Sequence, residues 1–460
     1  MKHPLYYGKL SALSSALLSI SSSIFAADTN TTPPSAEPAV QTLPTLSFQA
    51  SAEPQKQKDD DISAVPKTVI TRDEMLQYGD QSVMDALRRA AGFQLPTPGQ
   101  GPRGGGGASG MRFRGGAGPT FLINGEPVQG GPRGGMSIID TITPEMIERI
   151  EIVKQPSVAQ ASVASSAVIN IILKEPLDNR ISGSVKVGYG LRSSQQQESE
   201  NKQINIQADG RDNAWSYSVS ANQMWVDNTS LTKTETATGT REQARTVNRT
   251  MQMFAPRLQY DLDDQQKLIA ELFYRNIKMD GYSANQTQDD KNDSIRLNTR
   301  YERKDKDLSD KIRLSVERQT ETQLTRSLQN TIYTDETINE YGLAYDGMRK
   351  LDPDRQIKFG VDARSNNLDS NVSDSLDEQR YALYAEGSWR FTDRQTITLG
   401  ARQEWLNRSG LVDYQDQHLS PVLAYRFDLT EQWSIQTNLS QAFNSPKTDR
   451  LIPNVTVSTD

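Results

Sequence analysis

Cysteine is missing from the 460-residue chain, which excludes disulfides, thiolate nucleophiles and cysteine-ligated metal sites. Histidine is almost missing too: His3 and His418 are the two in the sequence, too few for a histidine-based metal site. The formal net charge of −7 argues against a nucleic-acid partner. Acid, base and nucleophile are nowhere grouped in a catalytic motif. We therefore expect neither an enzyme nor a resident cofactor.

Long hydrophobic runs are also scarce. Hydrophobic residues make up 35% of the chain, and beyond the N-terminal region no run reaches the roughly 20 residues of a membrane-spanning helix. This composition is typical of a polar soluble protein. A transmembrane β-barrel has the same composition, because only every second residue of its strands contacts lipid.

The N-terminal region has the organisation of a secretory signal. Lys2 and Lys9 precede an apolar, serine-rich run at residues 10–24, and Ala26 and Ala27 follow. Positive charge, apolar run and small residues in this order predict a signal peptide at residues 1–27, cleaved after an alanine. A buried helix or a retained membrane anchor are the alternatives.

Residues 28–66 are rich in Pro, Thr, Ala, Gln and Asp and bury too little apolar surface to fold alone. We expect a flexible tether. One short patch interrupts it, with two apolar side chains on one side of an extended strand. Such a patch suits strand addition to a partner's sheet edge, although a chance apolar spot in a linker is the alternative. The patch consists of Thr45, Leu46, Ser47, Phe48, Gln49 and Ala50.

Residues 67–176 predict a small domain of mixed strands and short helices. A capping box from Thr71 to Glu74 opens one helix, and Asp80 is expected to cap a second helix that Gly92 ends. Residues 121–123 form a strand that turns at Asn124-Gly125, a strong hairpin signal. Further on, Thr143-Pro144-Glu145 begins a helix, and residues 150–153 and 168–173 are strands.

Two glycine-rich loops in this domain, residues 95–118 and 130–135, carry arginines. They contain no phosphate-binding Gly-x-x-x-x-Gly-Lys-Ser/Thr motif. Their Arg-Gly segments are similar to those of single-stranded RNA binders, but the export signal and the acidic charge argue against that function. A third interpretation is that the glycines only permit tight turns.

From residue 181 to residue 460 the sequence alternates with period two. In residues 214–226, Trp215 and Tyr217 point one way while Ser216 and Ser218 point the other. In later segments the polar face carries charged residues: Lys358, Asp362, Glu386, Arg390, Arg402, Glu404 and Gln436. We count about 13 such strands, each about as long as the ~9–11 residues that cross a bilayer, with aromatic residues near the ends.

The connections between these strands alternate in length, as in outer-membrane barrels with short periplasmic turns and long external loops. A soluble sandwich or propeller is the alternative. Short connections lie at 210–213, 263–266, 392–394 and 428–431; long polar ones at 227–247, 277–292, 322–338, 365–378 and 406–417. An odd strand number and an unpaired last strand, residues 433–443, predict a barrel that is truncated at the C-terminus.

The domain at residues 67–176 resembles the plug of TonB-dependent outer-membrane receptors. The resemblance rests on the segments SVMDALR (82–88), MRFRG (111–115), FLINGEP (121–127), IERIEIV (147–153) and VINIILK (168–174), in the order of the family. Residues 442–446 are similar to a mid-barrel segment. The resemblance implies an α+β plug domain (67–176) followed by an all-β, antiparallel transmembrane β-barrel (177–460).

The resemblance also implies a function. Such receptors import a scarce ligand, most often a ferric siderophore, across the outer membrane. TonB binds a short N-terminal box of the receptor and supplies energy, and residues 45–50 stand where that box belongs. Cobalamin, saccharide or peptide uptake, or a passive pore or adhesin, are the alternatives. The plug and the residues after the mid-barrel segment lack histidine, which argues against haem.

The expected ligand-binding residues are arginines of the plug loops, because the guanidinium fork suits carboxylate, catecholate or phosphate oxygens. They are Arg103, Arg112, Arg114 and Arg133. For Arg112 and Arg114 we favour a structural alternative, in which both pair with glutamates of the barrel wall and hold the plug in place.

Overall fold

The computed structural model divides the chain into two units, residues 1–58 and 59–460, and describes residues of the second. The predicted signal peptide and the patch at 45–50 therefore lie outside the described residues. Within the described part, no helix is long and apolar enough to cross a membrane. The described residues are 62–65, 67–80, 82–90, 92–94, 111–113, 119–128, 139, 142–153, 158, 167–175, 181–194, 197–236, 239–430, 433–441 and 451.

The described residues between 62 and 175 form what we call the inner domain, built on a five-stranded sheet of order β1-β6-β7-β4-β5. β4 and β7 are parallel and the other neighbours antiparallel. A separate pair joins β2 (Phe93–Gln94) to β3 (Arg112–Phe113). The strands of the sheet are β1 (Lys67–Thr71), β4 (Thr120–Ile123), β5 (Glu126–Val128), β6 (Ile147–Val153) and β7 (Val168–Leu173).

Short helices complete the inner domain: α1 (Arg72–Tyr78), α2 (Val83–Arg89) and the 3₁₀ turn η3 (Pro144–Met146). The predicted cap of α1 is confirmed, since the Thr71 hydroxyl accepts a hydrogen bond from the Glu74 amide at 3.3 Å. Gly79, at φ 72°, ends this helix.

The predicted cap of α2 is wrong. Ser82 is the N-cap, and its hydroxyl accepts from the Asp85 amide at 3.3 Å. Asp80 lies too early in the chain to reach the first turn and instead forms an ion pair with Arg89 at the other end of the helix. The helix ends with Ala90 as its C-cap, before Gly92.

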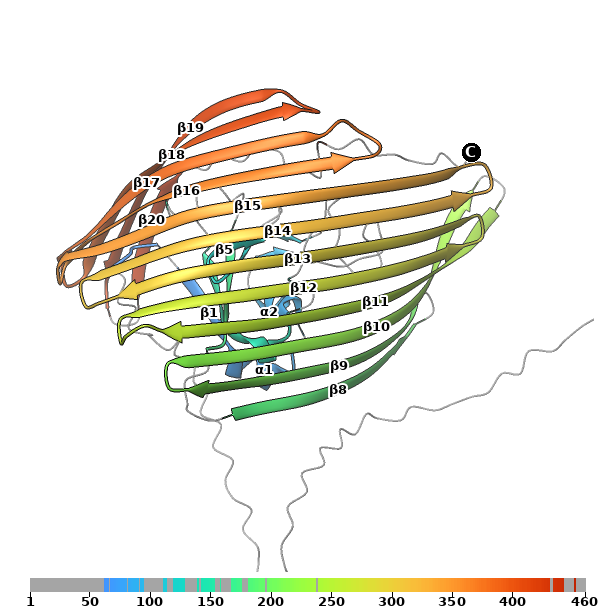
Figure 1. The fold of residues 1–460 in the computed structure, drawn as a ribbon, viewed down its shortest axis with the longest axis horizontal. Helices are drawn as coiled ribbons and strands as arrows, with labels where there is room; N and C mark the ends of the chain where they lie inside the picture. The colour runs from blue at the N-terminus through green and yellow to red at the C-terminus, as the bar shows by residue number, and fades with distance from the viewer. Residues whose placement is uncertain are drawn as a thin grey trace, which may run out of the picture. The chain divides into compact units, whose positions relative to one another are not determined.

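The core of the inner domain consists of apolar side chains from its sheet and helices. Met75, Leu87 and Ile150 are fully buried in it. The same cluster includes Met253, Ala255 and Phe273 from the second sheet. The inner domain therefore packs directly against one face of that sheet, which curves around it in Figure 1.

The second sheet, which we call the wide sheet, has 13 strands in sequence order, each antiparallel to the next. The predicted number of strands is confirmed. β8 and β20 are its two edges, and no described pairing joins them. The strands are β8 (Ile181–Ser193), β9 (Gln197–Asp212), β10 (Trp215–Thr236), β11 (Gly239–Asp261), β12 (Gln266–Ser283), β13 (Gln286–Lys304), β14 (Leu308–Ser327), β15 (Thr331–Asp352), β16 (Arg355–Ser370), β17 (Leu376–Thr392), β18 (Gln395–Gly410), β19 (Tyr414–Asp428) and β20 (Ser434–Ser440).

The two faces of the wide sheet differ as the alternation predicted. Ser216 and Ser220 are buried on the face toward the inner domain, whereas Trp215, Tyr217 and Val219 are exposed on the other face. The outward face is thus apolar and uncovered. That is the arrangement of a sheet that contacts lipid on one side and polar groups on the other.

The predicted lengths of the external loops are wrong: the strands extend far into the segments that the sequence predicts as long loops. β10 and β11 are joined by residues 237 and 238, and their ladder continues from the Trp215–Tyr260 pair to the Thr236–Gly239 pair. The other four polar connections likewise fall largely within strands. Antiparallel pairing satisfies the backbone N–H and C=O groups whatever the side chains are. The hydrogen-bonded ladder therefore continues through residues that no longer alternate between apolar and polar.

Candidate functional site

The hairpin of β4 and β5 forms a dense group of polar contacts with the wide sheet. Its two turn residues, Asn124 at φ 50° and Gly125 at φ 87°, both adopt the left-handed region that a tight hairpin turn requires. β7 holds the turn in place: the Gly125 amide donates to Asn170 Oδ1 at 2.9 Å, and the Leu173 amide donates to Asn124 Oδ1 at 3.0 Å.

Glu126, the residue after the turn, is the centre of the contact. Its side chain forms ion pairs with Arg313 and with Arg364, each at 3.1 Å, and the residue is 4% exposed. Arg313 Nη1 also donates to the Gly125 carbonyl at 2.5 Å. A carboxylate of the inner domain is thus held between two guanidinium groups of β14 and β16.

The residues on either side of Glu126 extend this contact along the wide sheet. Arg296 of β13 donates to the Pro127 carbonyl at 2.7 Å, and Asn124 donates through Nδ2 to Glu271 of β12 at 2.8 Å. Four successive hairpin residues therefore bond to β12, β13, β14 and β16. This set of contacts, residues 124–127 with their partners, is called the interlock below.

Opposing effects determine the protonation state of Glu126. Burial on its own raises the pKa of this carboxyl, but the positive charges of Arg313, Arg364 and Arg296 outweigh burial and hold the pKa below its ordinary value of 4.5. Glu126 is therefore ionised at neutral pH, and the interlock contains a charged pair rather than a neutral hydrogen bond.

The arginines of the interlock also pair with carboxylates of the wide sheet itself. Arg364 lies 3.4 Å from Glu340 and 3.2 Å from Asp362, and Arg313 lies 2.8 Å from Asp346. A buried charge is tolerated only when it is paired in this way. These arginines thus keep carboxylate partners on the sheet when their contacts to Glu126 are broken.

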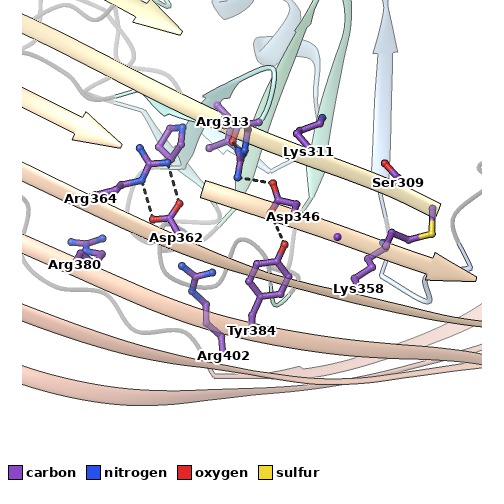
Figure 2. A pocket seen from close by; sticks show the side chains of 15 residues that line it. Ser309, Lys311, Arg313, Asp346, Lys358, Asp362, Arg364, Arg380, Tyr384 and Arg402 are labelled. Atoms are coloured by element: carbon purple, nitrogen blue, oxygen red, sulfur yellow. Dashed lines mark hydrogen bonds and ion pairs between the residues drawn. The ribbon is translucent and has the colours of Figure 1, made fainter. Parts of the chain in front are cut away.

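A cavity of about 300 Å³ lies beside the hairpin (Figure 2). The hairpin strands and turn contribute Leu122, Gly125 and Pro127, and the rest of the lining comes from β14 to β18. Two of the charged lining residues, Asp346 and Asp362, are acidic, whereas six are basic. The basic residues are Lys311, Arg313, Lys358, Arg364, Arg380 and Arg402.

A second set of contacts holds the end of the inner domain. Lys174 pairs with Asp209 at 3.2 Å, and Glu175 pairs with Arg257 at 3.1 Å and Lys267 at 3.0 Å. Burial raises the pKa of Glu175, but these two cations outweigh it and hold the pKa below its ordinary value. The partners belong to β9, β11 and β12, so this anchor and the cavity use different strands.

Of the arginines predicted to bind ligand, Arg112 lies among the described residues. It is exposed on β3, opposite Gln94, and no ion pair links it to a glutamate within the part of the chain that the structure describes. Arg103, Arg114 and Arg133 lie outside the described residues, as does the patch at residues 45–50. Their assignment therefore stays a prediction. No metal-binding group of three or more His, Asp or Glu occurs among the described residues.

The sequence reasoning missed the interlock, although its pieces were visible. The segment FLINGEP includes Glu126, but one acidic residue after a turn does not reveal its partners. The alternation did place Lys358, Asp362 and Arg402 on the inward face. It could not show that β14 to β18 bring them together around one cavity. Alternation tells which face of a strand a residue lies on, but not which residue of the next strand it is paired with.

Two family models match the chain. The model described as "TonB-dependent Receptor Plug Domain" matches residues 60–168, and "TonB dependent receptor-like, beta-barrel" matches residues 184–459. The second match alone covers more than half of the chain. No curated protein sequence matches the chain at a significant level.

Solved structures of siderophore receptors are similar in fold. A mutant of the ferric enterobactin receptor from Pseudomonas aeruginosa, in complex with enterobactin, matches with a TM-score of 0.64 at 17% identity, over 84% of this chain and 64% of that chain. The siderophore receptor PirA from Acinetobacter baumannii has a TM-score of 0.60 at 18% identity, over 83% and 61%. The ferric yersiniabactin uptake receptor FyuA from Yersinia pestis has 0.58 at 13%, over 82% and 64%. The chain thus spans less than two thirds of the length of these structures.

Proposed function

The chain belongs to the family of TonB-dependent receptors, and on that premise we propose that it imports a scarce ligand, first of all a ferric siderophore, across the outer membrane. Barrels of this family are outer-membrane proteins, and the family consists of receptors and transporters rather than enzymes. The siderophore receptors of similar fold support this choice of ligand. Cobalamin, a saccharide or a peptide are the alternative ligands.

The interlock is the observation that carries the proposal. An importer that is driven by energy must be closed at rest, and its closure must be released without destroying the barrel. The side chains of Asn124 and Glu126 and the carbonyls of Gly125 and Pro127 bond to four strands of the wide sheet, yet all of these contacts are polar and lie on one hairpin. Withdrawal of this hairpin would break them together and leave Arg313 and Arg364 paired within the wall.

Residues 28–66 and the strand that follows provide the route by which TonB acts in this proposal. Residues 45–50 bind TonB by strand addition, and force on the tether reaches β1, which begins at Lys67. β1 is an edge strand of the inner sheet and pairs with β6 alone. An edge strand has one row of hydrogen bonds to lose, so it is the element that yields first.

Ligand capture is assigned to the loops of the inner domain. In the proposed organisation, a signal peptide (1–27) and a tether (28–66) precede the plug (67–176), and the barrel strands follow from residue 177. Arg103, Arg112, Arg114 and Arg133 contact anionic oxygens of the ligand. This assignment concerns the contacts that these arginines make when the ligand is bound, and not their contacts in the resting state.

The test is expression and uptake under iron limitation. We expect the protein to increase several-fold in outer membranes of iron-starved cells, and radioactive iron from their spent medium to enter only while the proton gradient is intact. Unchanged abundance would shift the ligand to a cobalamin, saccharide or peptide. Uptake that ignores an uncoupler would overturn active import in favour of a passive pore.

A further inference from the structure

Two arginines face each other across neighbouring strands inside the cavity. Arg364 of β16 and Arg380 of β17 are direct cross-strand partners, and both line the cavity. Like charges at this position repel each other and destabilise a sheet unless anions lie close to them. The sheet provides Asp362 beside Arg364, at 3.2 Å, and Glu378 beside Arg380, at 3.1 Å. The pair is thus partly neutralised by Asp362, which lines the cavity itself, and by Glu378.

Arg402 of β18 adds a third guanidinium to the same space. It is 2% exposed and lines the cavity, and Figure 2 shows it beside Tyr384, with no dashed line to another lining residue. Its carboxylate neighbour is Glu404, with Nε and Oε1 3.3 Å apart, and the ring of Tyr384 lies 5.7 Å from its Cζ. The Nε atom of Arg402 is buried without a hydrogen bond. A buried, incompletely bonded guanidinium is a favourable partner for an anionic oxygen.

The basic lining continues from these arginines to the end of the wide sheet. Arg402 lies at the midpoint of β18, whereas Lys358, Lys311 and Ser309 follow toward the end of the sheet that carries the turns at residues 305–307 and 353–354. We call it the short-turn end, after the connections that the sequence predicts to be short. Ser309 is paired with Met348, next to the turn that precedes β14. The cavity is therefore a path along the wall, from mid-sheet to the short-turn end.

A carboxylate of the inner domain already binds two cations of this lining. Glu126 of the hairpin is bound to Arg313 and Arg364, two of the six lining cations. Glu126 thereby stands where an anionic group of another molecule would bind. If the hairpin withdraws, Arg313 keeps Asp346, and Arg364 keeps Asp362 and Glu340. Each guanidinium loses only its contact to Glu126, and an anionic group of another molecule can take that place.

We propose that this cavity is a transit site for an oligoanionic ligand, one with carboxylate, catecholate or phosphate oxygens, and that Glu126 occupies the site at rest and competes with the ligand for Arg313 and Arg364. The inference rests on the proposed import function and adds a site on the wall of the wide sheet and an internal competitor for it. Arg364, Arg380 and Arg402 bind the anion, and Lys358 and Lys311 lead it toward the short-turn end. Release of Glu126 and entry of the ligand are then one exchange of anionic groups at Arg313 and Arg364.

Citrate, a small tricarboxylate, is the probe for this site. The whole receptor is purified in detergent at low salt, and citrate affinity is measured by calorimetry. Glu126→Gln should bind citrate about tenfold more tightly than wild type, because the internal competitor has lost its charge. Adding Arg402→Gln to Glu126→Gln should remove about this tenfold gain in citrate affinity, whereas adding Arg402→Lys should retain most of it.

The matched control is Arg211→Gln in the same Glu126→Gln background. Arg211 also belongs to the inward face near the short turns, pairs with Asp261 at 2.6 Å, and lies on β9, away from the cavity. Its loss should leave citrate affinity unchanged, and heat-modifiable migration in gels verifies that each variant is folded. Equal affinities with and without Arg402, or an equal loss in the Arg211 variant, would overturn the transit site.

The two proposals fail separately. Gradient-driven iron uptake together with citrate affinities that do not depend on Arg402 would overturn the transit site and leave the import function standing. A citrate site that depends on Arg402, in a protein whose uptake ignores the proton gradient, would overturn active import and leave an anion site in a passive pore.

Discussion

Glu126 links the inner domain to two strands of the wide sheet through ion pairs with Arg313 and Arg364. Replacement by glutamine keeps the shape of the side chain but removes the charge that Arg313 and Arg364 share with it. We expect the inner domain to lose about 1–3 kcal/mol, the usual cost of a hydrogen bond to a charged group. Urea unfolding of the inner domain, followed by protease resistance, measures the loss. An unchanged midpoint would mean that the backbone contacts of Gly125 and Pro127 suffice.

The ion pairs of Glu126 with Arg313 and Arg364 predict that docking of the inner domain depends on pH. The pKa of Glu126 in the docked state lies below its ordinary value of 4.5, so docking is favoured by the ionised carboxylate. Its contribution is complete above pH 4.5 and is lost as the pH falls through the lower, docked-state pKa. Wild type and Glu126→Gln should therefore differ at pH 7 and converge in strong acid. A difference between the two proteins that persists in strong acid would contradict this assignment.

The predicted ligand residues belong to this scale as well. Charge reversal of Arg103 or Arg133 to glutamate should weaken ligand binding by tenfold or more, because a guanidinium that attracts an anion becomes a carboxylate that repels it. Binding of radioactive ferric siderophore to whole cells without an energy source measures this effect. Protease resistance of the inner domain should stay the same, and unchanged affinity would mean that these loops are only spacers.

Among the elements, α2 shows how a local contact decides where a helix begins. Ser82 caps it, and Ser82→Ala should destabilise the inner domain by about 1 kcal/mol. Ser82→Thr retains the hydroxyl and is the control. The urea midpoint distinguishes the two variants. Equal midpoints for the alanine and threonine variants would show that the cap contributes nothing measurable.

The hairpin and the wide-sheet strands show what local sequence predicts well. Asn124-Gly125 predicts a tight turn because both residues tolerate positive φ, and both adopt it. Alternation predicts which side chains of β10 and β16 to β18 face inward, since successive strand residues point to opposite faces. Strand length was predicted less well. The polar segment 227–247 continues the hydrogen-bonded ladder of β10 and β11. Side-chain composition does not reveal this, because backbone pairing does not depend on it.

At the scale of the whole molecule, the resemblance to TonB-dependent receptors is confirmed, as is a plug domain followed by a large antiparallel sheet. The structure adds several attachments between the parts, among them the interlock, the anchor at residues 174–175, the Glu145–Lys186 ion pair at 3.1 Å and a hydrogen bond from the Ala64 amide to Thr398 at 3.2 Å. The interlock binds β12, β13, β14 and β16, and the anchor at Lys174 and Glu175 binds β9, β11 and β12. The hairpin can therefore be released while the chain that leads into β8 stays attached.

The proposed energy coupling gives a prediction for the molecule as a whole. Phe48→Pro removes a backbone donor and fixes φ in the patch at residues 45–50, which prevents strand addition. Uptake should fall to background while ligand binding at the cell surface is unchanged. Radioactive ligand with and without an energy source separates the two quantities. Normal uptake in this variant would remove the patch from consideration as the TonB box.

The sequence by itself determined the chemistry of the two faces of each strand, the turn at residues 124–125, the number of wide-sheet strands and the family. All of these depend on residues that are neighbours in the chain, or on patterns that repeat along it. The partners of Glu126 were decided by the tertiary structure alone. Arg313 and Arg364 lie about two hundred residues away, and many inward-facing cations were equally available to a carboxylate. Only strand register and the docking of the hairpin select two of them, because an ion pair forms where the fold brings charges within a few ångströms.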